Sequence, residues 1–295
     1  MAVVPVSGRV ARVVGRERRA PVRRLVALLA LGLVAVVYFF PIYWLLATAL
    51  KGRGELYAAV PSLVPAQPTL EAFWSVLFER NFLVLLQNSI IVCGVSTALA
   101  LALGFAITYP ITRLQVSPKV RANVLNWALS LRFLPPIAVV VPYFSIVRGL
   151  GIYNQLPALI FVYTVFSLPF SVWMLKGFLV EIPQEVEEAA YVDGAGRLEA
   201  FRTVLLPLAA PGVLAAGIII FAFTWSEFLF ALILTATPRA QTFPVGVQGL
   251  VTQFEIIWNE MAAAAAIAIV VPLSLMLVAR RYVMAGLTFG VIREK

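Results

Sequence analysis

The sequence predicts an all-α integral membrane protein with six transmembrane helices. Its 295 residues are 62% hydrophobic and only 13% charged, which is too apolar for a soluble surface. Six apolar stretches each provide the roughly 20 residues that a helix needs to cross the hydrocarbon core. Positive residues gather between alternate stretches, as expected for a protein that crosses the membrane repeatedly.

The predicted spans follow one another along the chain. They are residues 25–50, 81–112, 122–147, 149–175, 203–237 and 261–279. Two spans contain a charge, Arg132 in the third and Glu227 in the fifth. The third and fourth spans contain prolines, which free backbone carbonyls and bend a helix. We therefore expect these two spans to face protein or a pathway rather than lipid throughout.

An amphipathic helix is predicted between the first two spans, within residues 51–82. Its apolar side chains recur at helical spacing and are Leu70, Phe73, Trp74, Leu77 and Phe78. Acidic and basic residues occupy the other positions. This pattern is typical of a helix that lies in the membrane interface, for anchoring alone or for docking.

Charge distribution predicts the orientation. With a cytoplasmic N-terminus, seventeen Lys and Arg residues fall on the cytoplasmic side and five on the outer side. The positive-inside rule then places both termini in the cytoplasm. Residues 1–24 form a basic N-terminal tail, 25–283 the transmembrane domain, and 284–295 a cytoplasmic C-terminal tail.

Composition also excludes several functions. The chain has no His and one Cys, Cys93, so disulfide frameworks, zinc sites and His-activated nucleophiles are excluded. We expect no enzyme activity, and Cys93 is interpreted as a small packing residue. No phosphate-binding GxxxxGK[ST] motif occurs, so this chain is not expected to bind ATP. The net charge of +9 is spread over membrane-flanking segments, which argues against nucleic acid binding.

One segment differs from the other cytoplasmic loops because it is acidic. Residues 176–206 hold six Asp and Glu against three Lys and Arg. Pro183 is suited to open a short helix, and Gly194 is suited to a left-handed cap at its end. A second helical stretch is predicted from about residue 197 to 205. The segment therefore reads as two short helices joined by a glycine-containing turn.

The sequence of this segment, "EEAAYVDGAGRLEAFRTVLLPLAAPG", resembles the EAA loop of binding-protein-dependent ABC importer permeases. We refer to residues 181–207 as the EAA loop. The matching residues are Glu188, Ala189, Ala190, Asp193, Gly194, Ala195 and Pro207. The resemblance implies that the first helix docks on a separate ATPase subunit. Small alanines permit close approach, the two acids can meet basic groups, and the glycine permits the bend.

Other segments are similar to the maltose-type carbohydrate branch of these importers, specifically to the smaller of its two permeases. They are "QNSIIV" at 87–92, "LGIYNQLPALIFVY" at 150–163, "FAFTWSEFLFALILT" at 221–235 and "AGLTFGV" at 285–291. The resemblance implies the type I permease fold and a bacterial or archaeal plasma membrane location. Residues 1–24 and the terminal "VIREK" depart from that pattern.

The same resemblance implies partners and a transport mode. A second homologous permease, an ATPase dimer that binds ATP and Mg, and an extracytoplasmic sugar-binding protein are expected. No cofactor is expected on this chain. The substrate would be a carbohydrate, from a monosaccharide or polyol to an oligosaccharide, moved inwards by alternating access. A secondary transporter or channel for a small polar solute is the alternative, although it would not need an EAA loop.

Candidate substrate contacts are Arg132, Trp225, Ser226 and Glu227. A guanidinium and a carboxylate can hydrogen-bond sugar hydroxyls, and an indole can stack on a sugar ring. Two structural alternatives remain open: Arg132 and Glu227 as an ion pair, because charges facing lipid are costly, and Trp225 with Glu227 as part of an interfacial belt.

Overall fold

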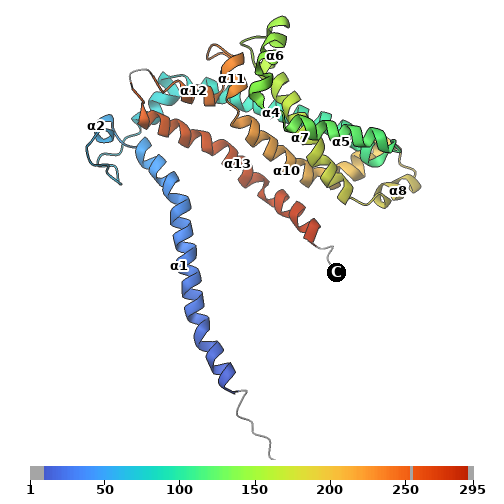
Figure 1. Ribbon diagram of the computed structural model, residues 1–295, viewed down its shortest axis with the longest axis horizontal. Coiled ribbons are helices and arrows are strands. Elements are labelled where there is room, and N and C mark those ends of the chain that lie inside the picture. The colour runs from blue at the N-terminus through green and yellow to red at the C-terminus, as the bar shows by residue number, and fades with distance from the viewer. Residues whose placement is uncertain (1–9, 253–254, 292–295) are drawn as a thin grey trace, which may run out of the picture.

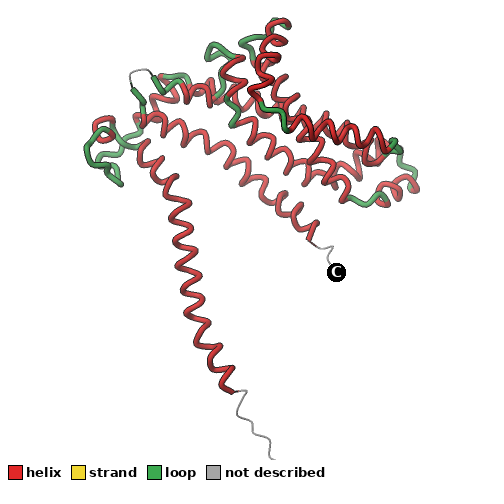
Figure 2. Tube along the Cα trace, viewed as in Figure 1, coloured by secondary structure: helices red, strands yellow, loops and turns green. Residues whose placement is uncertain are grey.

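The computed structural model describes residues 10–252 and 255–291 as helices joined by short loops (Figure 2). In chain order the elements are α1 Val10–Ala49, α2 Arg53–Leu56, α3 Glu71–Trp74, the π-helix η1 Ser75–Glu79, α4 Phe82–Arg113, α5 Pro118–Arg132, α6 Pro136–Gly149, α7 Leu156–Glu181, α8 Glu185–Val192, α9 Arg197–Ala200, the π-helix η2 Phe201–Leu205, α10 Leu206–Trp225, α11 Leu229–Leu234, α12 Phe243–Gln248 and α13 Trp258–Val291.

The helices confirm the predicted fold class. Among the described residues, five helices are long and apolar enough to cross a membrane, and a sixth span results if α5 and α6 are counted together. The third span is nevertheless broken, because α5 and α6 meet at 100°. Pro135 and Pro136 donate no backbone hydrogen bond, and the residue before a proline avoids helical geometry. The chain therefore leaves the helix after Arg132 and starts a new one at Pro136.

Two predicted span boundaries are wrong. The fourth span was expected from residue 149, but α7 begins at Leu156, after a turn in which Gly151 and Asn154 have positive φ. The fifth was expected to reach residue 237, but its helix ends at Trp225. A polar pair follows that residue, and the second member, Glu227, accepts hydrogen bonds from the first amides of α11.

Both terminal tails are largely helical. Helix α1 begins at Val10, so residues 10–24 continue the first span, and α13 runs to Val291. The remainders of the two predicted tails, 1–9 and 292–295, lie outside the described residues. Helix α1 leans away from the bundle (Figure 1). The C-terminal end of α1 contacts the start of α13.

A close helix pair, α4 against α7, forms the centre of the bundle. A side chain at Gly104 would overlap the Ser171 hydroxyl, so the two backbones can approach only because this residue is glycine. The Thr108 hydroxyl lies 2.6 Å from the Gly104 carbonyl and 3.4 Å from that of Val172. The free thiol of Cys93 is also buried on α4, as expected of a packing residue.

Polar side chains tie down the end of the bundle that carries α2. Asn88 donates its amide to the carbonyls of Pro238 and Gln241, at 3.0 and 2.9 Å. The buried carboxylate of Glu260, at the start of α13, forms ion pairs with Arg53 and Arg80. These contacts hold the non-helical segments against the spanning helices.

The predicted helix between the first two spans is present as α3 followed by η1, and its position in the membrane interface stays a prediction. Leu70, Trp74 and Phe78 are exposed on one side, and Ala72 and Val76 are buried on the other. The buried side faces α13, which places the aromatic side where lipid or a partner can contact it.

Candidate functional site

The EAA loop forms the end of the bundle opposite α2 (Figure 1). Helix α8 begins with an acidic first turn. These negative charges interact favourably with the positive end of the helix dipole. Glu188, Ala189 and Asp193 are exposed on it. Pro207 is the second residue of α10, where a missing amide hydrogen costs little. The predicted coupling residues thus lie on a short helix and at the start of the spanning helix that follows.

The turn after α8 has the predicted glycine geometry. Gly194 has φ +91°, a left-handed conformation that other residues rarely adopt. Its amide donates to the Tyr191 carbonyl and the Ala195 amide donates to the Ala190 carbonyl. This pair of bonds is the Schellman motif, which ends a helix and reverses the chain. Ala190 and Ala195 therefore close the turn with their backbones.

A buried ion pair fixes α8 to the rest of the bundle, and the sequence reasoning missed it. Glu187 Oε1 lies 2.7 Å from Nε of Arg113, the last residue of α4. The Arg113 guanidinium also donates to the carbonyls of Leu179 and Ile182, both at 2.8 Å. Burial raises the pKa of the Glu187 carboxyl, and the neighbouring guanidinium opposes that rise. One side chain thus joins α4, the end of α7 and the coupling helix.

The sequence contained one signal for this pair. Glu187 was counted only among the six acids of the loop, although an acid next to the EAA residues can lie on the buried side of a helix whose other side is exposed. Arg113 was counted only as a topology charge. Its place at the last residue of α4 puts a cation where helix ends leave carbonyls free, and the carbonyls that it binds are those of Leu179 and Ile182 at the end of α7.

A second site lies deeper in the bundle and contains both predicted intramembrane charges. Arg132 and Glu227 line one pocket of about 270 Å³. Its other lining residues are mostly aromatic or apolar and are Leu131, Tyr163, Phe166, Ser167, Pro169, Phe170, Ile220, Phe223, Thr224 and Phe230. Both charges sit at breaks between helices, where backbone groups are free of helix bonding.

The two charges have different partners within the described residues, and no ion pair joins them there. The Arg132 guanidinium lies 4.8 Å from the centre of the Phe170 ring, within cation–π range. Glu227 accepts the Tyr163 hydroxyl at 2.7 Å and the Phe230 amide at 2.9 Å. Glu227 is therefore held in place, whereas Arg132 keeps its hydrogen-bond donors available.

Trp225 and Ser226 do not join this pocket. The Trp225 indole is buried and donates to the Ala268 carbonyl of α13 at 3.2 Å. The Ser226 hydroxyl donates back to the Ala222 carbonyl at 2.8 Å. Both residues line a different hollow, of about 520 Å³, between α10, α12 and α13. The structure thus brings together two of the four predicted substrate contacts.

These features define a class: a helical membrane protein with up to six spans, a broken span at a central pocket, and a helix pair presented at one end. Over residues 98–287 the chain matches the family described as the binding-protein-dependent transport system inner membrane component. The chain belongs to this family of permease components.

Curated relatives match over most of the chain. The sulfoquinovosyl glycerol transport system permease protein SmoH of Agrobacterium fabrum is 36% identical, covering 89% of this chain and 91% of its own length. The trehalose transport system permease protein SugB of Mycobacterium tuberculosis is 34% identical, with 88% and 94% coverage.

Solved structures share the fold. A bacterial ABC transporter that imports the acidic polysaccharide alginate includes a chain with a TM-score of 0.74 at 17% identity, covering 95% of this chain and 100% of that one. The MetNI methionine ABC transporter gives a TM-score of 0.56 at 20% identity, with 74% and 99% coverage. The arrangement of helices is therefore that of ABC importer permeases.

Proposed function

We propose that this chain is the permease subunit of an ATP-driven importer that moves a carbohydrate into the cytoplasm by alternating access. The observation that carries the coupling role is the exposed α8, whose acidic and alanine residues face outward while Glu187 anchors its other side. The carbohydrate class is supported by the named substrates of the relatives, sulfoquinovosyl glycerol and trehalose.

The proposed coupling works through the anchored side of α8. A push on α8 by an ATPase subunit reaches Arg113, and from there the ends of α4 and α7 together. Those two helices form the close central pair. Glu188 and Asp193 supply the charge that meets basic groups of the ATPase, and Ala189 leaves room for contact.

The proposed partners follow from the same assignment. A separate ATPase dimer binds ATP and Mg, a second homologous permease completes the membrane part, and an extracytoplasmic sugar-binding protein delivers substrate. Helix α1 also calls for a second membrane subunit or lipid around it. The most apolar stretch within residues 24–49 has no residue buried by the rest of the chain.

The pocket of Arg132 and Glu227 is the proposed substrate contact in this chain. Aromatic rings provide stacking faces for sugar rings, and Arg132 provides charged donors for hydroxyl oxygens. The fixed Glu227 carboxylate provides an acceptor. Trp225 and Ser226 remain candidates only through the separate hollow that they line.

The proposed orientation places α8 and both termini in the cytoplasm. Reporter fusions after residues 65, 150 and 245 should read as external, and fusions after 116, 190 and 290 as cytoplasmic. The seventeen-to-five distribution of Lys and Arg is the reason. A cytoplasmic signal at 245 would overturn the six-span topology.

The test of coupling compares two charge reversals on α8. Glu188→Lys is expected to reduce sugar uptake and substrate-stimulated ATPase activity by tenfold or more, because ~1.4 kcal/mol of lost docking energy corresponds to tenfold. Glu185→Lys, an exposed acid one turn earlier, is the matched control and should retain most activity. Membrane insertion should be equal in both variants.

Two outcomes oppose the proposal. Near-normal uptake with Glu188→Lys contradicts the role of α8. Uptake that persists when the ATPase is absent favours a secondary transporter or channel instead.

A further inference from the structure

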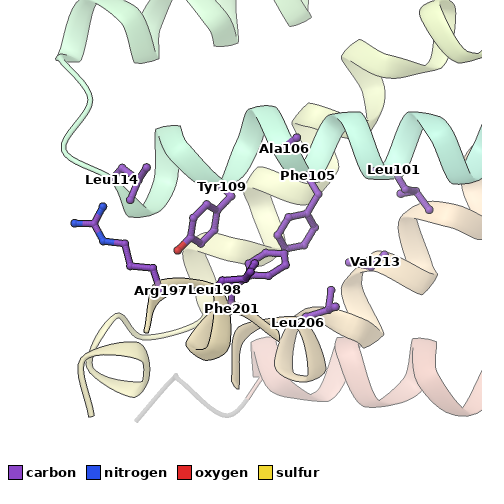
Figure 3. Close-up of a pocket in the computed structure, with 11 residues that line it drawn as sticks. Leu101, Phe105, Ala106, Tyr109, Leu114, Arg197, Leu198, Phe201, Leu206 and Val213 are labelled. Carbon is purple, nitrogen blue, oxygen red and sulfur yellow. The ribbon is translucent and has the colours of Figure 1, made fainter. Parts of the chain in front are cut away.

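A large apolar groove lies between α4 and the segment that runs from α9 through η2 into α10. It encloses about 610 Å³. Leu101, Phe105, Phe201 and Val213 form much of its wall, together with other leucine and alanine side chains (Figure 3). The Phe105 and Phe201 rings pack edge to face, with centroids 5.4 Å apart. The groove belongs to neither the proposed ATPase contact nor the central pocket.

The groove is polar at one end only. Arg197 and the Tyr109 hydroxyl lie at that end, and Leu101 and Val213 lie at the other (Figure 3). Arg197 is exposed and forms no ion pair with the side chains that the structure describes, those of residues 24–252, 255–278 and 280. A positive charge with no ion-pair partner among the described side chains therefore lies at the mouth of an apolar groove.

The position of the groove matches one leaflet of a bilayer. Its polar end is next to the end of α4 that carries α8, which the proposed topology places at the cytoplasmic surface. Tyr109 and Leu101 are eight residues apart on α4, or ~12 Å at 1.5 Å per residue. Half of a hydrocarbon core of about 30 Å is ~15 Å. The apolar wall is thus about as deep as a single leaflet.

We propose that this groove binds one anionic phospholipid of the inner leaflet, with an acyl chain along Leu101, Phe105 and Phe201 and the phosphate on Arg197. A guanidinium binds phosphate through paired, charge-assisted hydrogen bonds, and the Tyr109 hydroxyl can add a donor. Arg197, the charged residue among those that line the groove, complements an amphiphile with one charged end. The inference goes beyond carbohydrate import and uses only the orientation from the proposed function.

The bound lipid has a consequence for the EAA loop. Arg197 is the first residue of α9, three residues after the turn at Gly194, and the opposite wall is α4. A lipid held between them stabilises the loop against α4. Anionic lipid should therefore remain bound to the assembled transporter and should also raise its transport activity.

The first experiment measures lipid retention by the assembled transporter. The complex is reconstituted in nanodiscs of phosphatidylcholine and phosphatidylglycerol and then extracted in detergent. Native mass spectrometry measures how much of each phospholipid remains bound. Arg197→Gln should retain about fivefold less phosphatidylglycerol, since one basic residue near an anionic surface contributes ~1 kcal/mol. Arg202→Gln, an exposed arginine of the same loop outside the groove, is the control. Equal retention by both variants overturns the proposal.

The second experiment identifies the occupant directly. A photoreactive amino acid at Ala106, which lines the groove, should form a phospholipid adduct on illumination that Arg197→Gln diminishes. The same amino acid at Leu103, exposed on α4 outside the groove, should form lipid adducts that Arg197→Gln does not change. An adduct between position 106 and the second permease subunit would overturn the proposal, because the groove would then be a protein interface.

Discussion

Removal of the Glu187 side chain should release α8 from the bundle. Taking one partner from a buried ion pair costs about 3–5 kcal/mol. Arg113 keeps two carbonyl acceptors at 2.8 Å, so its charge is not left without partners. The expected cost of Glu187→Ala is therefore at the low end, about 3 kcal/mol, or roughly 100-fold in a local opening equilibrium at ~1.4 kcal/mol per tenfold.

Hydrogen–deuterium exchange across residues 183–195 measures this opening. The amides of α8 should exchange about 100-fold faster in Glu187→Ala than in the parent protein. Glu185→Ala is the matched control, because it removes an exposed acid from the same first turn and costs only ~0.3–1 kcal/mol of helix-dipole interaction. Equal exchange in the two variants refutes the anchoring role of Glu187.

The pH dependence of this exchange supplies a second readout. Burial raises the pKa of the Glu187 carboxyl, so docked α8 binds a proton more readily than released α8. The proton-linked part of the docking free energy is fully present below the ordinary carboxyl pKa and declines as pH rises through the raised pKa, while the ion pair with Arg113 limits that decline. Glu187→Gln should abolish this decline, and a decline that persists in that variant contradicts the assignment.

Three other outcomes test the pocket, the helix crossing and the opposite end of the bundle. Arg132→Met and Glu227→Gln should each impair uptake, and the double variant should lose less than the sum, because both side chains line one pocket; strictly additive losses reject the link. Gly104→Ala should lower the melting temperature of the solubilised subunit, because overpacking costs about 1–3 kcal/mol. Gly94→Ala is the control, since Gly94 has open space around it. Equal melting temperatures of the two variants argue against the close crossing of α4 and α7. Glu260→Gln should weaken two ion pairs and speed proteolysis within residues 52–68, and an unchanged cleavage rate contradicts that role.

The EAA loop could be predicted from sequence because its structure is encoded locally. Gly194 is required by a single backbone conformation, and an acidic run favours the start of α8. The membrane spans could be predicted for the same reason, since each one depends on its own length and hydropathy. Such features need no knowledge of which distant residues meet.

The pocket and the anchor could be predicted only in part. A double proline predicts a bend, but its size depends on what the two half-helices pack against. Glu227 was read as a charge inside a span, whereas its bonds to the first amides of α11 place it at a helix start. The pairing of Arg113 with Glu187 depends on how α4, α7 and α8 converge. Trp225 is likewise held away from the pocket by α13, because its indole N–H donates a hydrogen bond to the Ala268 carbonyl.

The break in the third span determines which parts of the molecule can turn together. A continuous helix is torsionally stiff, so a rotation applied at one end is delivered to the other. Between α5 and α6 that stiffness is lost, because Pro135 and Pro136 cannot bond to the preceding turn. Helix α5 packs along α7, while α6 packs against α11. A displacement that starts at the EAA loop can therefore rotate α5 with α7 while α6 keeps its contacts with α11.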